Sequence, residues 1–184
     1  MIVLKAAALA LALSATSAAQ ETASGPSVGH PLAPLCDLIC GGKWQPPTEP
    51  YPDEIRTTMT FAWDGETQTI KGASVRSGGI AGIIQVTNLT FAYDPATETI
   101  TQTRAPDPAH WSTTGGDLPA AVSGKVTLAD NAFQTRFDSP STPGEMMITA
   151  VRFETPDLWV ERSEITGGGQ STLGAEIRYA RTSE

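Results

Sequence analysis

Apolar and polar residues alternate over most of the chain after residue 54. Between residues 56 and 63, Met59, Phe61 and Trp63 alternate with small and hydroxyl-bearing side chains, which is the period of a strand with one buried face. Turn-forming pairs such as Asp64-Gly65 separate one such segment from the next. The pattern predicts strands over residues 56–63, 66–75, 83–93, 98–104, 121–128, 132–138, 146–154, 158–165 and 171–181.

The order of these strands predicts the architecture. Consecutive strands are joined by short turns, so each strand should pair with its neighbours in sequence, and such a sheet keeps two open edges unless it closes. We therefore expect an all-β, antiparallel up-and-down barrel of about 9–10 strands. A β-sandwich is the alternative, but it usually needs crossover connections. The stretch from Ala105 to Leu118 is expected to be a long loop or a broken edge strand.

A short helix is expected before the strands. Apolar residues recur at helical spacing in Pro31–Ile39, and Pro34 fits the first turn of a helix, where its missing N–H is not needed. Gly41 and Gly42 follow the last apolar residue, as in a helix that ends in a left-handed cap. Because the stretch after Trp44 is rich in proline, the strand that contains Trp44 should be short.

The first residues have the organisation of an export signal. One positive charge precedes an apolar run at residues 6–13, which is too short to cross a bilayer, and small residues precede Gln20. We therefore expect a signal peptide over residues 1–19, a flexible linker over 20–30 and a barrel domain over 31–184. Removal of the signal would leave a periplasmic or secreted protein with no membrane span in the mature chain.

The formal net charge of −8 at pH 7 bears on the class of partner. Phosphate backbones would be repelled by this charge, so nucleic acid is not an expected partner. The acidic balance is instead typical of a soluble exported domain.

The stretch Gly42-Lys43-Trp44 carries a family resemblance. A Gly-x-Trp motif after a short helix, opening a meander that ends in an arginine-bearing strand, resembles the calycin barrels. These barrels include the lipocalins, the fatty-acid-binding proteins and poorly characterised bacterial secreted barrel families. The resemblance implies that Trp44 closes one end of the barrel beside Gly42, and that an arginine of the last strand lies across the indole ring.

Strand parity selects the arginine of that pair. If Tyr179 faces inward, Arg181 also faces inward and Arg178 faces solvent. A guanidinium stacked on an indole contributes about 1–2 kcal/mol when it is partly desolvated. We therefore predict that Gly42, Trp44 and Arg181 form the barrel closure.

Cys36 and Cys40 are the two cysteines of the chain. Four residues apart on a helix, their Cα atoms would lie ~6 Å from each other, which is within the range for a disulfide. An exported protein meets oxidising conditions, so a disulfide that braces the short helix is predicted. The alternatives are two buried thiols or a redox-active pair, although the spacing differs from Cys-x-x-Cys. No histidine cluster accompanies the thiols, so no metal site is predicted.

His110, beside Trp111, is the histidine inside the expected barrel domain. Some calycin-like barrels bind haem through a histidine ligand, so the resemblance leaves haem bound through His110 as an alternative. A surface role is favoured because the sequence offers no second ligand, and no cofactor is predicted. No nucleophile with a base and an acid stands at a catalytic spacing, so the chain is more consistent with a protein that is not an enzyme.

Large apolar side chains on the strands supply a candidate binding site. A barrel of about ten strands is wide enough to hold a small ligand in its interior. The expected cavity-lining residues are Trp63, Phe91, Tyr93, Trp159 and Tyr179. The leading expectation is non-catalytic binding of a small apolar or amphipathic ligand. The alternatives are an envelope structural or interaction module with no small ligand, and a haem-binding or enzymatic barrel.

Overall fold

The structure is a computed structural model that describes residues 25–47, 54–79, 83–111, 118–139 and 142–182. The expected signal peptide and residues 20–24 of the expected linker lie outside the described residues. The described chain contains α1 (Ala33–Ile39), β1 (Lys43–Gln45), β2 (Ile55–Asp64), β3 (Thr69–Gly78), β4 (Ile83–Asp94), β5 (Thr99–Trp111), β6 (Val122–Ala129), β7 (Ala132–Asp138), β8 (Met146–Thr155), β9 (Leu158–Gly167) and β10 (Gln170–Thr182). Within these ranges, no helix has the length and apolar character needed to cross a membrane.

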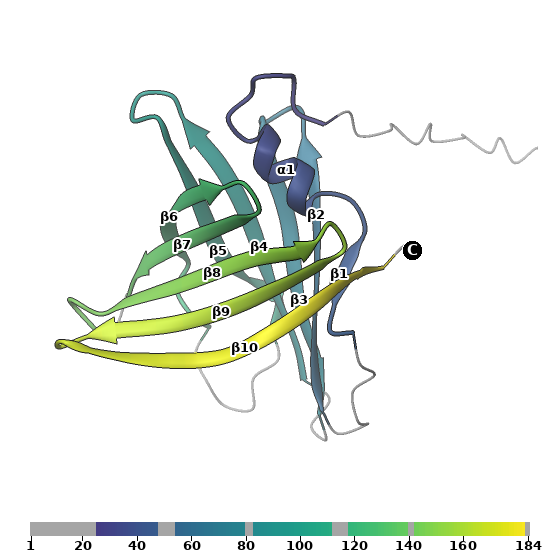
Figure 1. Ribbon diagram of the computed structural model, residues 1–184. Helices are drawn as coiled ribbons and strands as arrows, with labels where there is room; N and C mark the ends of the chain where they lie inside the picture. The colour runs from purple at the N-terminus through teal and green to yellow at the C-terminus, as the bar shows by residue number, and fades with distance from the viewer. Residues whose placement is uncertain (1–24, 48–53, 80–82, 112–117, 140–141, 183–184) are drawn as a thin grey trace, which may run out of the picture.

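The strands form one closed antiparallel barrel (Figure 1). Strands that are neighbours in sequence are also neighbours in the sheet, and β1 closes the barrel by pairing Trp44 with Arg181 of β10. This arrangement confirms the predicted all-β up-and-down barrel and excludes the sandwich. The helix α1 lies at the end that carries the β2–β3 and β4–β5 turns, which we call the capped end (Figure 1). As the prolines after Trp44 predict, β1 is only three residues long.

The second half of β5 distinguishes between two expectations. The prolines in this part of the sequence predict a loop or a broken edge strand from Ala105 to Leu118, and the structure shows a broken strand that continues to Trp111 and pairs with β6 only as far as Arg104, while residues 112–117 lie outside the described residues. Its ladder with β4 shifts register and leaves out residues 107–110, which form a bulge. A bulge accommodates prolines, which have no N–H to donate to a ladder, and the strand resumes after it.

Two hairpins at the capped end repeat one sequence. Residues 60–70 and 90–100 share Thr-Phe-Ala, an aromatic residue, Asp, and an ending Thr-x-Thr-Ile. In both hairpins the Asp carboxylate accepts a backbone hydrogen bond from the loop, at 3.0 Å from the nitrogen of Glu66 and at 2.9 Å from that of Ala96. These bonds hold four-residue loops, whereas the pair Asp64-Gly65 alone predicts a two-residue turn.

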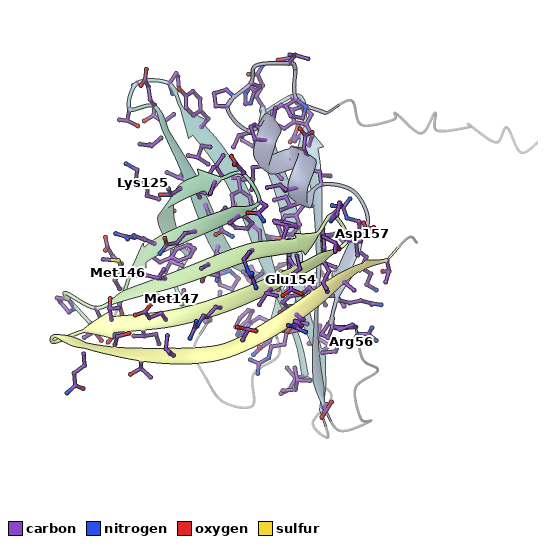
Figure 2. All side chains as sticks on the ribbon, in the orientation of Figure 1. Arg56, Lys125, Met146, Met147, Glu154 and Asp157 are labelled. Carbon is purple, nitrogen blue, oxygen red and sulfur yellow. A yellow bond between two sulfur atoms is a disulfide. The ribbon has the colours of Figure 1, made fainter. Side chains whose placement is uncertain are left out.

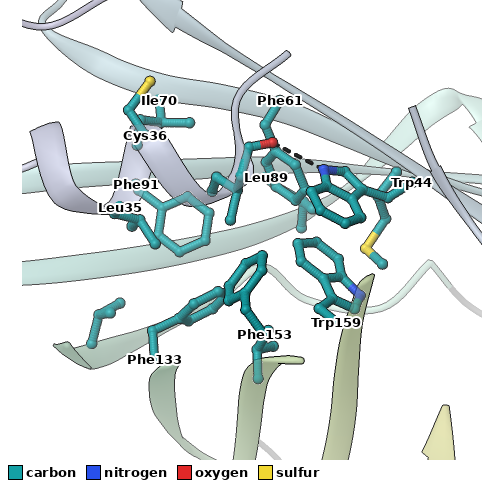
Figure 3. Packing of buried hydrophobic residues seen from close by; sticks show 14 of the residues in the cluster. Leu35, Cys36, Trp44, Phe61, Ile70, Leu89, Phe91, Phe133, Phe153 and Trp159 are labelled. Atoms are coloured by element: carbon teal, nitrogen blue, oxygen red, sulfur yellow. Dashed lines mark hydrogen bonds between the residues drawn. The ribbon is translucent and has the colours of Figure 1, made fainter. Parts of the chain in front are cut away.

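Aromatic side chains fill the capped half of the barrel (Figure 3). A glycine makes room for one of them, because a Cβ on Gly72 would lie 2.5 Å from a ring carbon of Phe61. Polar side chains such as Lys125 and Glu154 point away from the barrel (Figure 2). The alternation that predicts the strands is therefore a division between the barrel interior and its outer wall.

Candidate functional site

The last turn of α1 is held by two side chains of the barrel. The indole Nε1 of Trp44 donates a hydrogen bond to the carbonyl of Ile39 at 3.0 Å (Figure 3). Nη2 of Arg181 donates a hydrogen bond to the carbonyl of Leu38 at 2.7 Å. Because the final carbonyls of a helix have no partner within it, these two bonds fasten α1 to the barrel.

Arg181, Trp44 and Trp159 form a stack next to this turn. The guanidinium of Arg181 lies 4.6 Å from the centre of the Trp44 ring, and the Trp159 ring is stacked on Trp44 at 4.3 Å with an interplanar angle of 4°. Both groups are within stacking distance, so they occupy opposite faces of the Trp44 indole. Gly42 adjoins the stack, with a φ of +73°. The structure thus places together the three residues predicted to form the closure, and adds Trp159.

Cys36 and Cys40 stand at disulfide distance, with their Cα atoms 4.9 Å apart. The helix ends at Ile39 and Cys40 takes an extended conformation, so this separation differs from the value expected for two residues inside a helix. The cysteine pair and the two hydrogen bonds from the barrel therefore brace the same turn of the chain.

A cavity of about 180 Å³ lies inside the barrel. Phe91, Trp159 and Tyr179 line it, as expected from the sequence. Trp63 and Tyr93 are not part of the lining, because they stand closer to the turns and pack against the core at the capped end. The complete lining is Thr57, Met59, Phe61, Ser74, Thr87, Leu89, Phe91, Gln102, Arg104, Phe133, Thr149, Val151, Trp159, Glu161 and Tyr179.

Part of the cavity wall is polar and lacks hydrogen-bond partners within the protein. Oε1 of Gln102, Oγ1 of Thr149 and Nε1 of Trp159 are buried without a partner, and so is Nε of Arg104. Gln102 is only 4% exposed, and Thr149 and Trp159 are each 1% exposed. Most buried polar groups are paired, and leaving one unpaired costs about 1–3 kcal/mol. Where such an atom faces the cavity, a polar atom of a ligand or an ordered water molecule would satisfy it.

Arg104 of β5 and Glu161 of β9 bring opposite charges to the cavity. Burial lowers the pKa of Arg104 and raises the pKa of Glu161, and the charge of each group partly offsets the shift of the other. Burial also raises the pKa of Tyr179. Within the described residues, Arg104 and Glu161 form no ion pair with each other, and the Arg104 guanidinium lies 4.6 Å from the centre of the Phe137 ring.

The polar residues Gln102, Arg104 and Glu161 are missing from the lining expected from the sequence, although the alternation along their strands places them on inward faces. On β5, Gln102 and Arg104 share the face of Ile100, because side chains two residues apart point the same way. On β9, Glu161 shares the face of Trp159 for the same reason. A search for large apolar residues therefore finds the apolar wall and passes over the charged residues on the same faces.

His110 lies in the bulge of β5 and does not line the cavity. Its Nδ1 is 2.9 Å from Oδ2 of Asp107, and the other oxygen of that carboxylate accepts the backbone N–H of Ala109. The contact with His110 lowers the pKa of Asp107. The side chain of His110 is 63% exposed, whereas the haem alternative needs this histidine to point into the barrel. Across the described ranges, no three His, Cys, Asp or Glu side chains gather closely enough to hold a metal ion.

A wider hollow of about 550 Å³ lies outside the barrel, between α1 and the turns that follow β6 and β8. Asp37, Asp130 and Glu154 give it an acidic rim. Among the described residues, none of the buried unpartnered polar atoms belongs to its wall. The cavity inside the barrel is therefore the better candidate site.

No protein-family model matches this chain, and a search of curated proteins gives no match either. The closed antiparallel barrel is consistent with the resemblance to the calycins.

Proposed function

We propose that the barrel binds one small amphipathic molecule in its interior without changing it chemically. The observation that carries this proposal is a cavity with aromatic walls in which buried polar atoms of Gln102, Arg104 and Thr149 have no partner. The apolar part of a ligand would pack against Phe61 and Phe91. Its polar part would satisfy the unpartnered atoms, as a few placed polar groups do in other small-molecule sites.

The volume of the cavity limits the ligand to about one ring. A cavity of roughly 150 Å³ in another protein is large enough for benzene, and about 180 Å³ is available here. Sites for drug-sized molecules are larger, roughly 300–1,000 Å³. A long acyl chain would not fit unless the barrel expanded. The ligand expected from the sequence is therefore narrowed to a single-ring or comparably small compound.

Binding has better support than catalysis in this cavity. The hydroxyls of the lining belong to Thr57, Ser74, Thr87, Thr149 and Tyr179. A hydroxyl needs an adjacent base to become a nucleophile. Within the described residues, none of these hydroxyls forms a hydrogen bond with Glu161, the carboxylate of the cavity. The wall can hold and desolvate a polar group of a ligand, but in the described part of the chain its hydroxyls form no hydrogen bond with a base. The cavity is therefore better suited to binding than to nucleophilic catalysis.

The alternative of an interaction module without a ligand has less support. It expects an apolar patch on the outer wall, and Ile165 and Leu173 are both exposed on the neighbouring strands β9 and β10. The register pairs Ile165 with Thr172 and Leu173 with Glu164. Directly paired residues share a face of the sheet, so these two apolar side chains point to opposite faces and form no common patch.

Ligand binding can be tested with a variant that fills the cavity. Thr87→Tyr places a ring in the cavity, whereas Asn88→Tyr places the same ring on the exposed side of the same strand. We expect single-ring amphipathic compounds to stabilise the wild type and Asn88→Tyr by about 2.7 kcal/mol at a hundredfold excess over Kd, and to leave Thr87→Tyr unchanged. Thermal unfolding measures this effect, and quenching of the tryptophan fluorescence checks it. An equal response of the three proteins, or no response from any, would contradict the proposal.

A further inference from the structure

The cavity holds two opposite charges that do not neutralise each other by contact. Arg104 and Glu161 come from β5 and β9, and both line the cavity. Arginine remains protonated in proteins, and an ionised Glu161 would balance its charge, which makes the net charge of the lining zero in that state. A charged ligand would therefore add an uncompensated charge to a desolvated site, which is unfavourable.

The unpartnered atoms of the lining residues include both donors and acceptors. Nε of Arg104 and Nε1 of Trp159 donate, Oε1 of Gln102 accepts, and the hydroxyl of Thr149 can do either. Gln102, Thr149 and Trp159 are all more than nine-tenths buried, so they are shielded from bulk solvent. A ligand group that only donates or only accepts would leave part of this set unsatisfied.

On the basis of the function proposed above, we infer that the ligand is electrically neutral and that its head group both donates and accepts hydrogen bonds, as a primary carboxamide does. The carbonyl oxygen of such a group would accept from Arg104. Its two N–H bonds would donate to Glu161 and Gln102. The ring that carries the head group would pack against the aromatic wall formed by Phe61 and Phe91.

Charged ligands are the competing chemistry for the same cavity. A carboxylate would pair with Arg104 but would face Glu161, so Glu161 would have to take up a proton on binding. Burial raises the pKa of this carboxyl group, which favours such an uptake. A cation would pair with Glu161 but would face Arg104, which keeps its proton. The experiment below identifies an anionic or a cationic ligand by its Kd, which would then be lower than that of the neutral compound.

Three compounds of one shape separate these chemistries, because benzamide is neutral, benzoate is an anion and benzamidine is a cation. Toluene supplies the ring without a head group. In calorimetric titrations of the wild type at pH 7, the Kd of benzamide should be lower than those of the other three by about tenfold or more. Tighter binding of benzoate, with a binding enthalpy that depends on the ionisation of the buffer, would overturn the inference. Tightest binding of benzamidine would overturn it as well.

Two substitutions change the net charge of the cavity in opposite directions. Glu161→Gln leaves the charge of Arg104 uncompensated and should move the preference from benzamide towards benzoate by about tenfold or more. Arg104→Gln should move it towards benzamidine. Circular dichroism checks that each variant is folded. If Arg104→Gln does not fold, the Glu161→Gln variant decides alone, since an unchanged preference there would overturn the inference.

Failure of this inference and failure of the proposed function give different results. If all four compounds bind the wild type with similar Kd and Thr87→Tyr abolishes their binding, the cavity holds single rings but does not select a neutral head group. If none of the four compounds binds to the wild type, the proposed function fails together with the inference.

Discussion

Gly42 shows how the conformation of one residue determines the position of a side chain that is distant in sequence. Its φ of +73° lies in the left-handed region, and a Cβ there would lie 2.9 Å from Cγ of Arg181. Gly41 has nearly the same conformation, with a φ of +77°, but its Cβ would meet nothing within 4 Å. Both glycines therefore need a left-handed backbone conformation, but only Gly42 also needs the absence of a Cβ to leave room for Arg181.

The matched substitutions Gly41→Ala and Gly42→Ala measure these two requirements. Gly41→Ala should lower the free energy of unfolding by about 1 kcal/mol through backbone strain alone. Gly42→Ala should cost a further ~1–2 kcal/mol, because Arg181 must move away from the Trp44 ring. Denaturant unfolding measures the difference, and near-ultraviolet circular dichroism reports on the indole stack. Equal losses in the two variants would mean that Arg181 does not pack against Gly42.

At the level of elements, α1 depends on the barrel for its stability. Its seven residues are fewer than an isolated helix needs to persist in water, and no side chain caps its N-terminus. Leu35 and Ile39 are fully buried, and the carbonyls of its last turn accept hydrogen bonds from Trp44 and Arg181. The helix is therefore a part of the barrel closure that is formed by tertiary contacts.

Arg181→Met tests whether the arginine stack holds this element. The substitution should lower the free energy of unfolding by about 2–3 kcal/mol, because it removes the stack on Trp44 and a charge-assisted hydrogen bond to Leu38. Arg178→Met is the matched control. The Arg178 side chain is 57% exposed and pairs with Glu154 on the outer wall, so its loss should cost less than about 1 kcal/mol. Comparable losses in urea unfolding would contradict the role of Arg181 in the closure.

For the whole molecule, the barrel topology follows from information that is local in sequence. Alternating segments joined by short turns favour pairing between neighbours, and a closed barrel satisfies both edges of that sheet. At β5, where the prolines predict a long loop or a broken edge strand, the strand is interrupted by a bulge but does not end there. The bulge at residues 107–110 lets the strand resume, because pairing with β4 stabilises the chain on both sides of it. Such long-range support cannot be read from a local pattern.

The candidate site is predictable only in part. The aromatic residues Phe91, Trp159 and Tyr179 follow from the strand alternation, since large apolar residues on an inward face are expected there. Arg104 and Glu161 follow the same alternation. A charged residue on an inward face indicates a polar site only when the residues across the barrel from it are known, and the sequence alone does not give them. The presence of a cavity depends on how the volumes of side chains from many strands add up, and this requires the three-dimensional packing.

The closure and the cavity share one residue. Trp159 stacks on Trp44 at 4.3 Å and also lines the cavity, where its ring meets Tyr179 and Phe61 at centroid distances of 5.8 and 6.1 Å. The capped end therefore forms part of the cavity wall. A change in the closure should alter the shape of the cavity as well as the stability of the barrel.

The most direct test of a ligand-binding interior is a crystal structure of the protein grown with the single-ring compound that stabilises it most. We expect density for the ring beside Phe61 and Phe91, with polar atoms of the compound within hydrogen-bond distance of Gln102, Arg104 or Thr149. A cavity closed by a direct ion pair between Arg104 and Glu161, with the compound bound on the outer surface, would contradict this expectation.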